Sequence, residues 1–237
     1  QLGSPLDLDA ALKVVGSMGK LRYGILGASE DDVVFDVDDL TILQDGSDYG
    51  VARFLYETKS ETGVYQGVGF ISTLSEHPEE NAYVLGLDYH FLSSQGKWKA
   101  DGQIFYSDTD EDGSGLGGYA DLTYRPSRRM QLNFSASHYD DQLDLNDLGF
   151  LRRNDVTNFW MQAEYRRYDF GWARKIYLNS FLSYEVNGDG EKTNKEIGGR
   201  TGIDFNNRHE VRWDIAYKPE RIDDRDSRGN GSSIKKQ

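Results

Sequence analysis

Alternation between apolar and polar residues is the feature that most constrains this fold, and it is clearest in residues 118–139. Within residues 130–136 every second side chain is apolar, and the positions between are polar: Gln131, Asn133 and Ser135. A period of two residues indicates a β-strand with one apolar and one polar face. Residues 118–124 predict the partner strand and residues 125–129 the turn. The polar face carries small uncharged side chains, which suit a water-filled interior as well as open solvent.

The same alternation recurs along the whole chain and predicts about twelve strands, most of them roughly nine to eleven residues long. Strands of this length can cross a bilayer at a tilt, whereas strands of soluble proteins average about five or six residues. The predicted strands are residues 8–16, 21–28, 49–58, 63–74, 82–92, 97–107, 118–124, 130–139, 156–166, 176–186, 197–205 and 209–217.

Composition excludes several classes of protein. The chain holds no run of eighteen apolar residues, so a transmembrane helix is excluded. A mean hydropathy of −0.69 still allows a membrane β-barrel, because only alternate residues of each strand face lipid. The absence of cysteine excludes disulfides and thiolate sites, and the net charge of −13 argues against nucleic acid as a partner.

The predicted connections alternate between short and long, with basic residues at the short-turn end and acidic residues in the long loops. Outer-membrane barrels have this pattern of tight periplasmic turns and longer external loops. We therefore predict an all-β, antiparallel up-and-down transmembrane barrel segment over residues 1–218, followed by a polar loop or tail over residues 219–237. The first predicted strand would start, and the last would end, on the long-loop side, whereas both termini of a complete barrel should be periplasmic. We therefore expect at least one further strand at each end, which makes this chain a segment of a larger barrel of about fourteen strands or more.

Residues 144–155, which read DLNDLGFLRRND, resemble the "pdFnpdlGFvrRxD" segment of an uncharacterised family of bacterial outer-membrane barrels. Residues 12–16 and 23–28 resemble the "aKvtGrxg…yGvlxA" hairpin near the start of that barrel, and residues 86–89 resemble its "GvDaxy" strand. Barrels of this family usually follow a domain like carbohydrate-binding module family 9, which the resemblance would place before residue 1. The family implies no activity and no catalytic residues. The matching residues of the loop are Asp147, Gly149, Phe150, Arg152, Arg153 and Asp155.

This loop also contains Leu148, Phe150 and Leu151 beside its two arginines. A purely solvated outer loop does not need apolar side chains. We therefore predict that the loop folds inward or packs on a neighbouring element.

Asp108, Asp110 and Asp112, followed by Gly113, match the opening of an EF-hand-type calcium loop. The twelfth position is Tyr119 rather than the expected glutamate, and the alternative interpretation is a solvated acidic loop. If calcium does bind, it would bridge the acidic loops to the phosphates of lipopolysaccharide. Otherwise no cofactor is expected.

One set of charged residues would line the barrel interior: Asp88, Lys99, Asp101, Glu164, Arg166, Arg212 and Asp214. They would either set the selectivity of a pore or form a self-neutralising ladder across the wall, and we favour the ladder. The histidines, serines and carboxylates form no recognisable catalytic pattern, so an enzyme is not predicted.

The sequence thus predicts a non-enzymatic β-barrel of the bacterial outer membrane, acting as a channel, transporter or surface scaffold with acidic extracellular loops. Its expected partners are membrane lipid and lipopolysaccharide, together with a partner protein or an upstream carbohydrate-binding-like domain. The alternative is a soluble all-β glycan-binding module whose aromatic residues form a binding platform.

Overall fold

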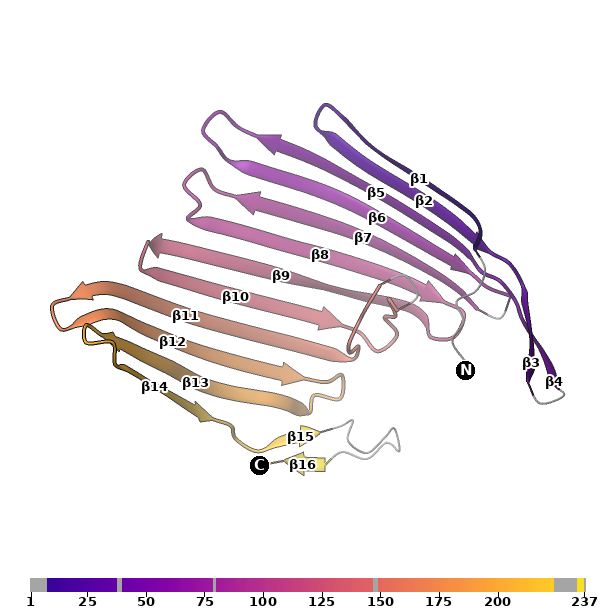
Figure 1. Cartoon of the computed structure of the whole chain (residues 1–237). Coiled ribbons are helices and arrows are strands. Elements are labelled where there is room, and N and C mark those ends of the chain that lie inside the picture. Colours follow the sequence, from indigo (N-terminus) through magenta and orange to yellow (C-terminus); the bar gives the residue numbers. More distant parts are fainter. Residues whose placement is uncertain (1–7, 38–39, 79, 147–148, 224–233, 237) are drawn as a thin grey trace.

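Twelve strands of the chain form a single antiparallel sheet (Figure 1). The structure is a computed structural model that describes residues 8–37, 40–78, 80–146, 149–223 and 234–236. The strands of the main sheet are β1 (Leu8–Met18), β2 (Leu21–Glu30), β5 (Asp48–Lys59), β6 (Tyr65–Glu76), β7 (Asn81–Leu92), β8 (Trp98–Thr109), β9 (Gly113–Ser127), β10 (Met130–Tyr139), β11 (Val156–Phe170), β12 (Ala173–Val186), β13 (Lys192–Phe205) and β14 (Glu210–Tyr217).

Neighbours in the sheet are consecutive along the chain, except that β2 pairs with β5 across an inserted hairpin. The described residues include no helix, and hence none that is long and apolar enough to cross a membrane. The prediction of an all-β antiparallel fold with about twelve strands is confirmed.

Several strands are longer than the alternation predicted. The first strand of the hairpin begins at Gly113 instead of residue 118, because Gly113, Gly115 and Gly117 pair with Thr109, Ser107 and Phe105 of β8. Likewise β11 extends to Phe170 and β12 begins at Ala173, whereas the alternation predicted that these strands end at residue 166 and begin at residue 176. Backbone pairing depends little on side-chain type, so a ladder continues where the apolar pattern stops.

The strict alternation of short and long connections is therefore wrong in detail. Residues 77–80, 110–112 and 187–191 are short connections, and within the described part of the chain only residues 31–47 and 140–155 are long. The first of these was predicted as an acidic loop, but it contains the hairpin of β3 (Val33–Val37) and β4 (Leu40–Gln44). Within the predicted polar tail, β15 (Arg221–Asp223) pairs with β16 (Ile234–Lys236).

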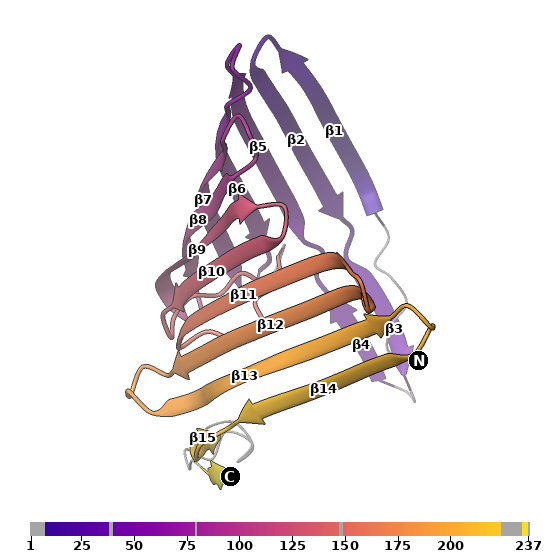
Figure 2. The same cartoon turned by 90° about the vertical axis from the view of Figure 1, so that its left-hand side faces the viewer.

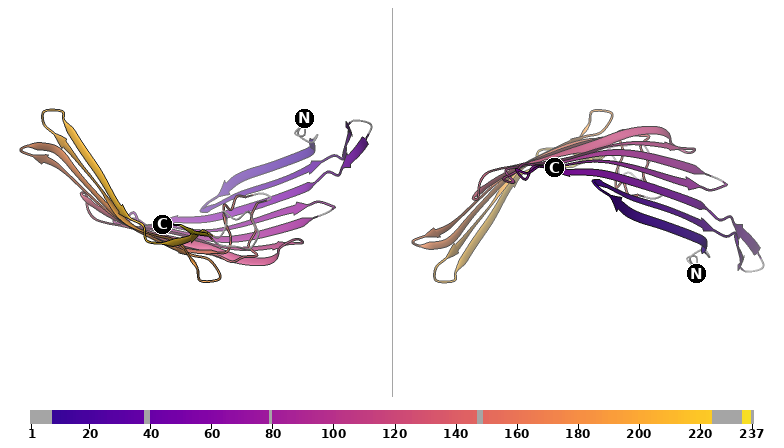
Figure 3. Two further views of the ribbon diagram at one scale, coloured as in Figure 1. Left: turned by 90° about the horizontal axis from the view of Figure 1, so that it is seen from below. Right: turned by 90° about the horizontal axis from the view of Figure 1, so that it is seen from above.

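The sheet is open and strongly curved (Figures 2 and 3). Its edges are β1 and β14, which do not pair with each other in the described part of the chain. The structure thus shows one curved layer, and closure into a barrel belongs to the proposal below.

The register places most of the large apolar side chains of the strands on one face. In one row across four strands, Phe54 pairs with Phe70, Phe70 with Leu87, and Leu87 with Ile104. These side chains are not buried: Leu87 is 58% and Ile104 is 65% exposed. The fully or nearly buried hydrophobic residues of the described segments are few, namely Ala82, Leu143, Val156 and Ala173.

The apolar face is the convex one. Residues 140–146 and 149–155 lie on the concave side of the sheet (Figure 3), and Leu143 packs on Gly115 and Gly117 of β9. Both glycines lie on the face opposite the apolar row, because Gly117 pairs with Phe105, which follows Ile104 in β8 and therefore points the other way. The concave face therefore carries most of the charged and polar side chains of the strands, and the convex face most of the large apolar ones.

Candidate functional site on the concave face

The concave face collects most of the charged side chains that lie within the strands. The register puts every predicted lumen-lining residue on this face: Asp88, Lys99, Asp101, Glu164, Arg166, Arg212 and Asp214. Trp98, Tyr124 and Trp213 lie on the opposite, convex face, where the rings of Trp98 and Tyr124 stack with centroids 4.0 Å apart.

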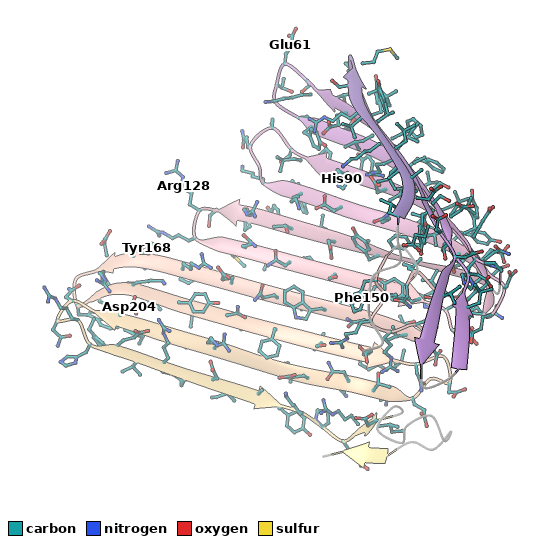
Figure 4. All side chains as sticks on the ribbon, turned by 45° about the vertical axis from the view of Figure 1, so that its right-hand side comes forward. Glu61, His90, Arg128, Phe150, Tyr168 and Asp204 are labelled. Atoms are coloured by element: carbon teal, nitrogen blue, oxygen red, sulfur yellow. The ribbon has the colours of Figure 1, made fainter. Side chains whose placement is uncertain are left out.

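A chain of ionic contacts crosses β5, β7 and β8 on the concave face. Arg53 forms an ion pair with Asp88 through both terminal guanidinium nitrogens: Nη1 contacts Asp88 Oδ1, and Nη2 donates to Asp88 Oδ2 at 3.0 Å. His90 (Figure 4) lies between two carboxylates, with its Nε2 3.1 Å from Asp88 Oδ2 and its Nδ1 2.8 Å from Asp101 Oδ1. Lys99 then contacts the other oxygen of Asp101 at 2.5 Å. Asp88 is only 6% exposed, which is unusual in a sheet with so little buried surface.

Gly69 makes room for this chain. A Cβ at Gly69 would overlap the Asp88 carboxylate and lie 2.6 Å from both terminal nitrogens of Arg53. The β6 strand between Arg53 and Asp88 therefore carries no side chain at the crossing point, and the ion pair spans it directly.

Neutral amides continue the polar surface across the middle of the sheet. Asn133 Oδ1 accepts from Thr123 Oγ1 at 3.0 Å and from Gln131 Nε2 at 2.9 Å, while its Nδ2 donates to Gln162 Oε1 at 3.0 Å. These contacts link β9, β10 and β11. The small polar residues of the hairpin thus bond to one another across strands.

Further ion pairs lie on β11, β13 and β14, towards the β14 edge of the same face. Arg166 pairs with Glu164, Arg212 pairs with Glu210, and Arg200 Nε donates to Asp214 Oδ1 at 2.8 Å. Each predicted lumen charge thus has an oppositely charged neighbour on the same face. This arrangement is the one expected for a self-neutralising ladder of charges across the wall.

The loop between β10 and β11 is anchored on the concave face by Leu143. Leu143 is fully buried, and the neighbouring Asp144 donates its backbone N–H to the hydroxyl of Ser107, itself fully buried, at 3.0 Å. A Cβ at Gly115 would overlap the Leu143 backbone, and one at Gly117 would lie 2.6 Å from Leu143 Cδ2. The two glycines thus form the seat for this side chain.

The later part of the loop reaches the neighbouring strands. Arg153 lies 3.5 Å from Glu185 of β12, and Asp155 Oδ1 accepts from the backbone N–H of Gly188 at 2.8 Å. The prediction that the loop folds inward and packs on its neighbours is confirmed for these residues. Asp147 and Leu148 lie outside the described residues.

The buried residue that anchors the loop lies outside the apolar stretch that the sequence singled out. Phe150 (Figure 4) is 81% exposed, so its side chain does not hold the loop down. Leu143, which sequence reasoning missed, does so. The sequence feature that could have indicated this contact lies elsewhere in the chain. Glycines at every second position, 113, 115 and 117, leave one face of the strand without side chains, so that another residue can pack against its backbone.

The predicted calcium ligands lie at the turn between β8 and β9. Asp108 Oδ1 accepts from Ser114 Oγ at 3.1 Å, and Asp110 Oδ2 accepts from the backbone and side-chain nitrogens of Asn81 at 3.0 and 2.9 Å. Within the part of the chain that the structure describes, no group of three or more acidic or histidine side chains is arranged to hold a metal. A calcium site at Asp108, Asp110 and Asp112 stays a prediction from the sequence.

Comparison with protein families gives one match, a domain of unknown function (DUF5916) whose model covers residues 68–237. This range is more than two thirds of the chain and includes β7–β14 with the loop between β10 and β11. No curated protein and no solved structure matches.

Proposed function

We propose that the chain, which belongs to the uncharacterised DUF5916 family, forms part of the wall of a β-barrel in the bacterial outer membrane. The observation that carries this proposal is the relation between curvature and polarity. A soluble barrel places its apolar side chains inside, whereas this sheet carries them on its convex face and its ion pairs on its concave face. That arrangement suits lipid outside and water inside.

The convex face has no protein partner in the part of the chain that the structure describes. Burying one large aliphatic side chain contributes about 1.5–3 kcal/mol, and this sheet leaves rows of such residues exposed. Lipid acyl chains would cover all of these side chains at once. The strand lengths support the same assignment, since β7 and β8 have 12 residues each and about nine to eleven suffice to span a bilayer.

The edges of the sheet fit the same proposal. Unpaired backbone groups of β1 and β14 would be costly in the hydrocarbon region, so we propose that further strands pair with both edges and close the barrel. The interior would then be lined by the ion-pair ladder and narrowed by residues 140–146 and 149–155. Such an interior is compatible with a channel, a transporter or a surface scaffold. The end of the barrel that carries the acidic loops would face lipopolysaccharide.

Heat-modifiable migration on a denaturing gel tests this assignment. We expect the protein, extracted from membranes in detergent, to resist SDS without heating and to migrate as a compact band distinct from the boiled sample. The reason is that a closed hydrogen-bonded ladder leaves SDS no edge at which to open the sheet. A soluble glycan-binding module would instead run at the same position before and after boiling, and would be recovered outside the membrane fraction.

A further inference from the structure

A groove of about 430 Å³ lies on the concave face across β11, β12, β13 and β14. Arg166, Tyr177, Gly202 and Arg212 occupy one row of the register from β11 to β14. Arg200 and Lys175 line the groove on either side of this row, near the short-turn end where Asp204 is labelled in Figure 4. We call this site the basic groove.

Glycine creates the space at the centre of the basic groove. A Cβ at Gly202 would meet only Arg212, at 3.6 Å and beyond, so a larger residue would fit there and its absence leaves a hollow. Tyr177 forms one wall, with Arg166 Cζ 5.5 Å and Lys175 Nζ 5.9 Å from its ring centroid. These distances are in the range of cation–π contacts, which hold both cations beside the hollow.

The arginines of the basic groove are oriented by carboxylates that do not line it. Arg200 uses Nε for Asp214, Arg212 uses Nε for Glu210, and Arg166 uses Nη2 for Glu164. The other guanidinium nitrogens of each arginine are not used in these pairs. A guanidinium fixed at one nitrogen still presents parallel N–H donors, which match the two oxygens of a carboxylate or phosphate.

The charges that line the basic groove are unequal. Four cations face it, and Asp204 is the one carboxylate among its described lining residues. Asp204 is itself 3.9 Å from Arg174, which lies outside the groove. A small anion can therefore enter the groove without meeting an uncompensated carboxylate.

We propose that the basic groove is a binding site for an oxyanion, either a phosphate group or the carboxylate of an acidic sugar. Arg200 and Arg212 would bind the oxyanion through their terminal nitrogens, while Lys175 adds a point charge. This inference goes beyond the proposed barrel function and depends only on the concave face, so failure of the membrane assignment would leave it intact.

Titration calorimetry of the detergent-purified protein at low ionic strength tests the site, with inorganic phosphate, galacturonate and neutral galactose as probes. We expect uptake of phosphate or galacturonate, or of both, and no uptake of galactose. The double variant R200Q/R212Q should bind the same anions at least about ten-fold more weakly, because each guanidinium supplies charge-assisted hydrogen bonds.

Arg22→Gln is the matched control, because Arg22 is also exposed on the concave face and ion-paired, at 2.6 Å from Glu57, but lies on β2. It should leave both affinities unchanged. If the double variant loses its β-sheet circular dichroism, Lys175→Gln replaces it and should weaken binding several-fold. Binding by R200Q/R212Q, or by Lys175→Gln where it is used instead, that equals binding by the wild type would overturn the proposal, and so would no uptake of either anion by the wild type.

Discussion

Ile104→Arg is expected to destabilise the protein in lipid vesicles by about 2–4 kcal/mol, the cost measured for a cation at the bilayer midplane on the outside of a barrel. Ile104 lies in the middle of β8 on the convex face and is 65% exposed. In a water-soluble sheet the same exposed position would tolerate arginine with a change of about 0.5 kcal/mol or less. The measurement is urea unfolding of the protein reconstituted in vesicles.

Gln103→Arg is the matched control for this substitution. Gln103 precedes Ile104 in the same strand, so it lies at nearly the same depth but on the concave face. Its arginine would remain in water near Asp88 and Asp121, and we expect a change well under that of Ile104→Arg. Equal effects of the two substitutions would mean that the two faces meet the same environment, contrary to our assignment.

Asp88→Ala is expected to destabilise the protein by about 2 kcal/mol, which is less than the cost of breaking a fully buried pair because the remaining Arg53 side chain is 34% exposed. The side chain of Asp88 is 5% exposed, and its loss would leave Arg53 without its carboxylate and His90 with Asp101 alone. Urea unfolding again measures the change in free energy.

An exposed ion pair on the same face supplies the comparison. Asp214 and Arg200 are each 63% exposed, so Asp214→Ala should cost less than about 1 kcal/mol. A second comparison is the double variant R53A/D88A, which should be less destabilised than the sum of the two single variants because the pair is removed together. Additive losses, or a small effect of Asp88→Ala, would show that the contact is not stabilising.

The sequence predicted which residues share a face better than it predicted where strands stop. Alternation through Leu132, Phe134 and Ala136 marks the phase of a strand directly, because side chains alternate between faces. Strand ends carry no such mark. The residues from Gly113 to Gly117 pair with β8 although they lack an apolar pattern, and the alternation predicted a strand only from residue 118.

The loop between β10 and β11 makes a contact that the sequence alone did not predict. Its apolar residues near Arg152 correctly suggested that it packs against other elements, but the buried contact is made by Leu143. That contact depends on Gly115 and Gly117, which lie in a different strand. The basic groove was missed for the same reason, since Arg166, Gly202 and Arg212 become neighbours only once the register of β11–β14 is known.

Tryptophan fluorescence in vesicles of brominated lipid tests most directly whether the convex face contacts lipid. Trp213 lies on the convex face of β14, and Trp160 lies on the concave face of β11, where it pairs with Ser135. Single-tryptophan variants that keep one or the other, with phenylalanine at the remaining tryptophan positions, should respond oppositely. We expect brominated acyl chains to quench Trp213 strongly and Trp160 weakly, and iodide in the aqueous phase to do the reverse. Stronger quenching of Trp160 than of Trp213 by the brominated lipid would contradict the membrane assignment.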